Sequence, residues 1–156
     1  MTAIKTAGPQ QAAELARLHA RAFTEHDAWG APAMAAVLEL PSTHALMIYT
    51  QSVPAGFIII QQVADEAEVL TLAIDPQFHR HGLARKLLLQ AVRQLLGQGV
   101  TRLVLDVASD NDAAIGLYES LGFTQDGLRK AYYSRPGQAR MDALLMSRSI
   151  SGQDDP

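Results

Sequence analysis

The chain has 156 residues, of which 48% are hydrophobic and 19% charged, and its net charge is −3. This size and composition fit one compact domain with a full core, and the lack of a basic excess argues against nucleic acid as a ligand. No cysteine is present, which excludes disulfides, thiol catalysis and cysteine-ligated metal clusters.

The ends of the sequence and its apolar runs bear on location. The first residues carry Gln, Glu, Arg and His throughout, unlike a signal peptide, and no apolar run approaches the ~20 residues of a membrane-spanning helix. We therefore expect a cytoplasmic protein with no membrane partner. Segment 151–156 is polar and ends in proline, so we expect a disordered tail after a single domain over residues 1–150.

Helical and extended patterns alternate in the first half of the chain. Apolar positions at helical spacing after Pro9, among them Leu15, Leu18 and His19, predict an amphipathic helix, and a short second helix is expected after Pro32. Apolar runs then predict three strands, over residues 44–50, 55–63 and 67–75.

The second half continues the alternation. Apolar residues along one face from Leu83 to Leu96 predict a long helix that ends at Gly97 or Gly99. The elements expected after it are a strand over 101–108, a helix over 112–122 and two strands over 123–134 and 139–150. Strands separated by helices predict a three-layer α/β domain, with a parallel strand pair where the long helix joins two strands.

One turn between a strand and a helix is unusual in its charge. The stretch "HRHGLARKLL" (79–88) places Gly82 directly before the long helix. A helix start leaves backbone N–H groups unpaired and carries about +0.5 charge, and glycine lets a ligand approach them closely. The cations beside it are Arg80, Arg85 and Lys86. The stretch is typical of a phosphate site, with an ordinary turn as the alternative. A metal site at His79 and His81 would lack a third ligand.

Two motifs resemble those of a known family. "HRHGLA" resembles the acyl-CoA-binding signature of the GCN5-related N-acetyltransferases, written Q/R-x-x-G-x-G/A, and "NDAAIGLYESLGF" is similar to their second signature, N-x-x-A-x-x-L-Y-x-x-x-G-F. The two lie in the family's order and spacing, and the resemblance runs from about Ala45 to Ile150 and more weakly over the N-terminal helices. It implies the family's three-layer α-β-α fold, whose mixed and mostly antiparallel sheet holds the cofactor at a splayed parallel strand pair.

The resemblance also implies a reaction, the transfer of an acetyl group from acetyl-CoA to an amine, without a metal. The pyrophosphate of the cofactor would lie on backbone amides at Gly82, and its pantetheine arm would pair with the backbone of the preceding strand. The residues that would bind the cofactor are Leu72, Ala73, Ile74, Arg80, His81, Gly82, Leu83, Ala84, Arg85, Asn111 and Tyr118.

Two residues receive catalytic roles from the same resemblance. Tyr118, whose phenol has a pKa near ~10, would protonate or hold the departing CoA thiolate, and the alternative is a core tyrosine. Asp106 interrupts an apolar strand and would assist removal of the amine proton, and the alternative is an exposed strand residue. Asn111 would cap the following helix as well as contact the cofactor.

The C-terminal half narrows the resemblance to one branch of the family. The stretches "LDVASDNDAAIGLYESLGF" and "RKAYYSRPGQARMDALLMSRSI" resemble the bacterial ribosomal-protein-alanine N-acetyltransferases. Trp29, Tyr132 and Tyr133 would then line the substrate side, beside a mobile loop over residues 135–140. Trp29 alternatively pins the first two helices together, and the loop is alternatively an ordinary Pro-Gly hairpin.

Two positions depart from the family pattern, and they leave other functions open. His79 replaces Gln or Arg in the first signature, and Asp106 stands where the branch has glutamate. An α-amine with a pKa of about 8 is about 3 kcal/mol easier to deprotonate than a lysine at about 10.4, which favours a protein N-terminus as the acceptor for a short carboxylate. The alternatives are acetylation of a small-molecule amine and a non-catalytic acyl-CoA-binding regulator. We expect a monomer or a weak dimer.

Overall fold

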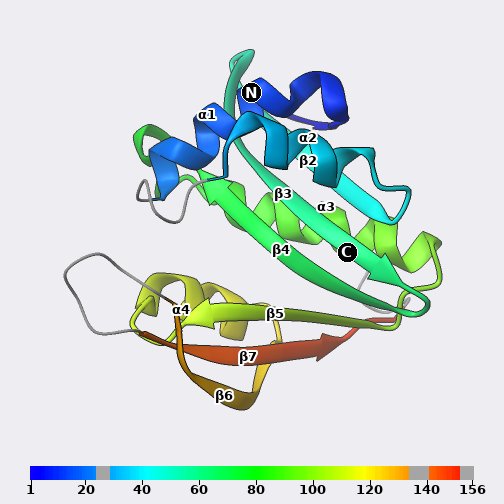
Figure 1. Ribbon diagram of the computed structural model, residues 1–156, viewed down its shortest axis with the longest axis vertical. Coiled ribbons are helices and arrows are strands. Elements are labelled where there is room, and N and C mark those ends of the chain that lie inside the picture. Colours follow the sequence, from blue (N-terminus) through cyan, green and yellow to red (C-terminus); the bar gives the residue numbers. More distant parts are fainter. Residues whose placement is uncertain (24–28, 134–140, 152–156) are drawn as a thin grey trace.

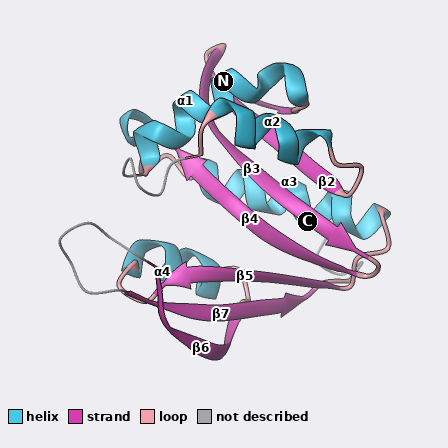
Figure 2. Cartoon of the chain, in the orientation of Figure 1, coloured by secondary structure: helices cyan, strands magenta, loops and turns pink. Residues whose placement is uncertain are grey.

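The structure is a computed structural model that describes residues 1–23, 29–133 and 141–151. A mixed sheet of seven strands forms its middle layer, and helices cover both faces of this sheet (Figure 1, Figure 2). The predicted three-layer α/β architecture is confirmed. The expected tail lies outside the described residues from position 152 onward.

The predicted helices and strands are all present. The helices are α1 (Ala12–Ala22), α2 (Ala31–Glu39), α3 (Leu83–Gly97) and α4 (Asp112–Ser120), with short 3-10 turns at Pro9–Gln11 and Pro76–Phe78. The strands are β1 (Thr2–Thr6), β2 (Thr43–Thr50), β3 (Val53–Val63), β4 (Glu66–Ile74), β5 (Arg102–Ala108), β6 (Thr124–Tyr133) and β7 (Met141–Ser149). No helix in the described part of the chain is long and apolar enough to cross a membrane.

Strand β1 was not predicted from the sequence. It is a five-residue edge strand that pairs antiparallel with β2, and Ile4 is its one partly buried side chain. A strand this short, with one face in solvent and only one neighbour, shows no alternation long enough to recognise. Its formation depends on the open edge of β2.

The strand order explains how a parallel pair arises in a mostly antiparallel sheet. The order is β1-β2-β3-β4-β5-β7-β6, and every neighbouring pair is antiparallel except β4 and β5. Helix α3 connects these two strands, as a parallel crossover requires. The expected mixed sheet with one parallel pair is confirmed.

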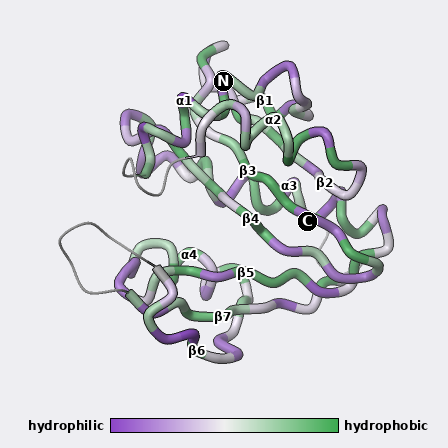
Figure 3. Tube along the Cα trace, viewed as in Figure 1, coloured by the Kyte–Doolittle hydropathy of each residue, from purple (hydrophilic) through white to green (hydrophobic). Residues whose placement is uncertain are grey.

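Two hydrophobic cores fill the spaces between the layers. On one face α3 and α4 pack on the sheet, and the apolar stripe predicted for α3 is buried there. On the other face α1 and α2 pack through Leu15, Leu18 and Met34, which are fully buried. Strand β3 lies between the two cores, so its run 57–60 is buried on both sides and forms a hydrophobic stretch in the middle of Figure 3. Each buried leucine of this kind stabilises the fold by about 2 kcal/mol.

A bulge in β4 changes which face its side chains occupy. Residue Thr71 pairs with Ile59 and Val69 with Ile60, so Leu70 has no partner on β3. Val69 belongs to the core under α3, whereas Ala73 belongs to the core under α1 and α2. One extra residue in a strand of period two moves every later side chain to the opposite face. The sequence did not predict this bulge.

The parallel pair is short and splayed. Pairing runs only from Glu66 with Arg102 to Val69 with Leu105. Both strands continue beyond these pairs, and they diverge toward their carboxyl ends (Figure 1). The edge of β4 that faces β5 therefore lacks a strand partner over its last residues, as the resemblance implied.

Candidate active site

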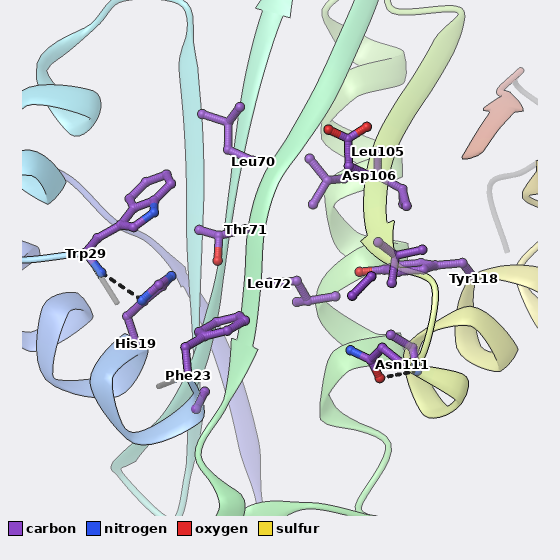
Figure 4. A pocket seen from close by; sticks show the side chains of 15 residues that line it. His19, Phe23, Trp29, Leu70, Thr71, Leu72, Leu105, Asp106, Asn111 and Tyr118 are labelled. Atoms are coloured by element: carbon purple, nitrogen blue, oxygen red, sulfur yellow. Dashed lines mark hydrogen bonds between the residues drawn. The ribbon is translucent and has the colours of Figure 1, made fainter. Parts of the chain in front are cut away.

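A cleft opens where β4 and β5 part (Figure 4). Its volume is about 370 Å³, and its two long walls are residues 69–72 of β4 and 105–108 of β5. The end of α1 and Trp29 close one side, and Asn111 with the first turns of α4 closes the other. Residues from three distant stretches of the sequence, 19–29, 69–72 and 105–118, meet here.

Five of the sequence-predicted site residues line this one cleft. They are Trp29, Leu72, Asp106, Asn111 and Tyr118. Figure 4 shows Trp29 on the α1 side, Leu72 on the central strand, and the other three on the side of β5 and α4. Predictions made from separate motifs thus converge on a single place in the fold.

On the side of the cleft formed by α4, Asn111 and Tyr118 both line the cleft, and both also show the structural role that was their alternative. Asn111 Oδ1 accepts a hydrogen bond from the Ala114 N–H at 3.2 Å, which confirms the helix cap. Tyr118 is only 7% exposed and its ring centroid lies 5.6 Å from that of Phe123, so it packs in the core while it lines the cleft. Burial and access to the cleft coexist in this tyrosine.

Asp106 lies on the open face of β5 and not in a core. Its neighbours Leu105 and Val107 point into the core under α3 and α4, so alternation turns Asp106 to the other face, where it is partly buried at the cleft. Glu68 of β4 pairs with Val104, two residues before Asp106. Partial burial and the nearby Asp106 charge raise the pKa of the Glu68 carboxyl, against a smaller opposing effect of Arg129. Two carboxylates therefore lie close together at this end of the cleft.

The α1 side of the cleft is an aromatic wall, of which only Trp29 was assigned to the site from the sequence. His19 is 2% exposed, and its Nδ1 accepts a hydrogen bond from the Trp29 backbone N–H at 3.0 Å. Its ring stacks on Phe23 and Trp29, with centroid distances of 4.4 and 5.4 Å. Trp29 lines the cleft and also packs among the residues of α1 and α2, so its packing role is confirmed and its substrate role stays a prediction. The only sequence signal for His19 was its place on the apolar face of α1.

The Gly82 loop follows β4 and opens toward solvent. Gly82 caps α3 with φ +71°, and Arg80 also has a positive φ of 69°. A Cβ on Gly82 would meet no atom within 4 Å. The first hydrogen bond of α3 runs from the Lys86 N–H to the Gly82 carbonyl at 3.1 Å, so the N–H groups before it have no partner inside the helix. The geometry is that of an open turn before a helix, which is typical of anion-binding sites, and the binding itself stays a prediction.

Two of the side chains around this loop make hydrogen bonds to neighbouring elements. His79 Nε2 lies 3.1 Å from the carbonyl oxygen of Ile74, and the Arg85 guanidinium donates to Ser120 Oγ at 3.2 Å. His81 is exposed, and Leu83 is buried. Among the described residues, no group of three or more His, Asp or Glu side chains is placed to hold a metal ion.

An ion pair fastens the cleft wall to the loop. The Arg21 guanidinium donates to both Asp75 carboxylate oxygens, at 2.6 and 3.1 Å, and the Gln77 N–H donates to the same carboxylate at 3.0 Å. The Asp75 side chain is 6% exposed. These hydrogen bonds, the one from Arg21 above all, hold the pKa of Asp75 below its ordinary value in spite of burial. Helix α1 is thereby joined to the end of β4, where the loop begins.

Three further predicted site residues whose side chains the structure describes, Ala73, Ile74 and Tyr132, lie outside the cleft lining. Ala73 and Ile74 continue β4 beyond the cleft, toward the Gly82 loop. Tyr132 is 45% exposed on β6, with the Arg129 guanidinium carbon 4.5 Å from its ring centroid. Tyr133 ends β6, and the expected loop over residues 135–140 lies outside the described part of the chain. A substrate role for these residues stays a prediction.

Comparison with known proteins gives the class. The sequence profile of the acetyltransferase (GNAT) family matches residues 12–123, from the start of α1 to the end of the second signature. The chain therefore belongs to the GNAT family of acetyltransferases.

Some curated proteins and solved structures are similar to the chain over most of their length. The [ribosomal protein bS18]-alanine N-acetyltransferases of Salmonella typhimurium and Escherichia coli are 45% and 44% identical to the chain over 97 residues, which is 62% of this chain and 65% of each relative. The matched part thus spans slightly less than two thirds of those proteins. The crystal structure of the Escherichia coli ribosomal-protein-S18-alanine N-acetyltransferase superposes with a TM-score of 0.90 at 32% identity, covering 97% of this chain and 95% of that one.

Proposed function

We propose that the chain is an N-acetyltransferase that moves the acetyl group of acetyl-CoA to the N-terminal α-amine of a protein, with ribosomal protein bS18 as the leading acceptor. The observation that carries the proposal is the cleft at the splayed β4–β5 pair, which brings Asp106 and Tyr118 together beside a strand that leads to an anion-binding turn. The relatives named above are [ribosomal protein bS18]-alanine N-acetyltransferases, and the choice of bS18 as the acceptor rests on them.

The residues present fit the cofactor. The open turn at Gly82 offers unpaired N–H groups to a diphosphate, and the unpaired edge of β4 at Leu72, Ala73 and Ile74 offers backbone groups to the pantetheine amides. Acetyl-CoA supplies the reactive thioester. The loop residues that would hold its pyrophosphate are those assigned from the sequence, from Arg80 to Arg85.

Asp106 and Tyr118 divide the proton transfers between them. The acceptor nitrogen forms a bond to the acetyl carbon as the carbon–sulfur bond breaks, so the nitrogen loses one proton and the sulfur gains one. Asp106 takes the first proton through a water molecule, because its side chain is one methylene shorter than glutamate. Tyr118 donates the second from its phenol. About a tenth of an α-amine with a pKa of about 8 is already neutral at pH 7, so a weak base such as Asp106 is sufficient.

The acceptor enters from the face of the sheet that carries α1 and α2. Trp29 lies on that side of the cleft, opposite Asp106 (Figure 4). Tyr132, Tyr133 and the segment 135–140 are proposed to bound the same entrance. A cytoplasmic location is part of the proposal, because ribosomal proteins are the acceptors, and a monomeric or weakly dimeric state is proposed beside it.

The test is an acetylation assay with purified protein and acetyl-CoA. The acceptors are the N-terminal peptide of bS18, the same peptide with a blocked N-terminus and an internal lysine, and a panel of small amines. We expect mass spectrometry to find one acetyl group on the free N-terminus of the first peptide and none on the second. Faster turnover of small amines would overturn the choice of acceptor, and tight CoA binding without any product would support the regulator alternative.

A further inference from the structure

One buried hydroxyl at the cleft has no hydrogen-bond partner. Among the described residues, Thr71 Oγ1 is the single buried side-chain nitrogen or oxygen that lacks one. Thr71 is 8% exposed and belongs to the β4 wall of the cleft. Buried hydroxyls in folded proteins are almost always paired, so an orphan at a binding cleft calls for a partner that arrives from outside.

The bulge at Leu70 is what brings this hydroxyl to the acceptor side. In a regular strand Thr71 would share a face with Ala67 and Val69, under α3. The register shift places it instead on the face of Ala73, which packs under α1 and α2. Bulges beside active sites commonly redirect a side chain in this way.

The surroundings of Thr71 leave few groups that could pair with it. The side chains of the α1 wall are the rings of His19, Phe23 and Trp29, and Figure 4 shows Thr71 between these rings and the side that carries Asp106 and Tyr118. A valine has the same shape without the hydroxyl, and it would suit a strand surrounded by apolar side chains better. The hydroxyl is therefore a cost to the free protein that a bound polar group would remove.

We propose that Thr71 binds the acceptor amine, so that its hydroxyl oxygen accepts one N–H of the attacking nitrogen while the other N–H is directed to Asp106 through water. This inference rests on the proposed function. A neutral primary amine has two N–H groups and one lone pair, and two acceptors on opposite walls leave the lone pair to point at the acetyl carbon. Oγ1 is covered in the free chain, so binding includes a rotation of the side chain between staggered χ1 positions.

The test compares Thr71→Val with Thr71→Ser in the full chain. Valine keeps the shape and removes the hydroxyl, and serine keeps the hydroxyl. Steady-state rates are measured with the bS18 N-terminal peptide, the affinity for CoA is measured by calorimetry, and the melting temperature of the free chain is recorded. For Thr71→Val we expect about a tenfold or greater loss in kcat/KM for the peptide, unchanged CoA affinity, and a melting temperature no lower than that of the wild type. Thr71→Ser should stay within about threefold of the wild type.

The stability measurement separates acceptor binding from a packing role. If Thr71 only fills space, Thr71→Val should be as active as the wild type, and that result would overturn the inference. A loss of activity in both variants together with a lower melting temperature would mean that Thr71 acts through packing, and it would overturn the inference as well. A wild-type chain that acetylates no peptide refutes the proposed function itself and Thr71 with it. An active wild type with an equally active Thr71→Val variant refutes only the role of Thr71.

Discussion

The substitution Gly82→Ala separates backbone strain from loss of the anion site. Gly82 has φ +71°, where an L-residue is strained by about 1–2 kcal/mol. The added methyl meets no atom within 4 Å, so strain is the whole cost to the fold. On the proposed function, we nevertheless expect the methyl to hinder the approach of a diphosphate to the unpaired N–H groups of the first turn of α3, since it adds a side chain where the turn has none. We expect the free energy of unfolding to fall by about 1 kcal/mol, because alanine also restricts the unfolded chain.

The same helix supplies a matched control. Gly99, just beyond the other end of α3, has φ +80°, and its added methyl likewise meets nothing within 4 Å. Gly99→Ala should lose the same stability in urea unfolding. In calorimetric titration with CoA, Gly82→Ala should bind about ten- to hundredfold more weakly than the wild type, as expected when a charge-assisted hydrogen bond is lost, whereas Gly99→Ala should be unchanged.

Two results would refute this reasoning. Equal weakening of CoA binding in both variants would mean that strain in α3, and not access to its first turn, governs affinity. Unaltered binding in Gly82→Ala would mean that the diphosphate lies elsewhere. If the wild type shows no heat with CoA, the cofactor assignment fails together with the acetyl transfer.

Three further predictions concern stability. Gly56→Ala should lower the free energy of unfolding by several kcal/mol in urea titrations, because its Cβ would lie 2.5 Å from the Ala73 carbonyl oxygen, and this oxygen belongs to the backbone of β4 and cannot move away at little cost. Asp75→Asn should cost about 2 kcal/mol at pH 7. Since the folded pKa of Asp75 is lowered, its contribution is complete above its ordinary value of 3.8 and is lost as the pH falls through the folded value, so the difference from the wild type should vanish in unfolding measured at the most acidic pH. The pKa of Glu68 is shifted in the opposite direction. Because its raised pKa penalises the charged form in the folded chain, Glu68→Gln should stabilise the chain by a few tenths of a kcal/mol at pH 7. The gain should shrink as the pH falls through the raised folded pKa and should be absent below the ordinary value of 4.5. A Glu68→Gln variant less stable than the wild type at pH 7 would contradict this.

The parts of the site that could be predicted from the sequence are those that a local backbone builds. The Gly82 turn needs only a glycine between a strand and a helix, and the Asn111 cap needs only its own side chain and the N–H three residues later. Asp106 was recognisable because a charge interrupts an apolar strand. In each case the signal and the structural feature occupy the same few residues.

The parts that the sequence did not yield depend on contacts between distant elements. The run around Thr71 is apolar on both sides, so nothing in it distinguishes a regular strand from a bulged one. The bulge becomes visible only in its register with Ile59 and Ile60 of β3. His19 likewise has a clear place only once the Trp29 backbone N–H reaches its ring. The edge strand β1 forms on a partner strand whose paired residues lie 40 to 48 positions away.

On the proposed function, β4 contacts both acetyl-CoA, through its backbone edge, and the acceptor amine, through Thr71, and the bulge at Leu70 makes the second contact possible. Cofactor binding needs the backbone edge that faces β5, which the divergence of the two strands leaves free, and backbone groups are available whichever way the side chains point. The acceptor needs a polar side chain on the opposite face from α3. Without the bulge, Leu72 and Ile74 would turn toward α1, where the hydroxyl now lies, and Thr71 would enter the hydrophobic core under α3. A single unpaired residue therefore places the apolar side chains in the core under α3 and the hydroxyl on the acceptor face, which a regular strand of this sequence could not do, and it leaves the cofactor edge available.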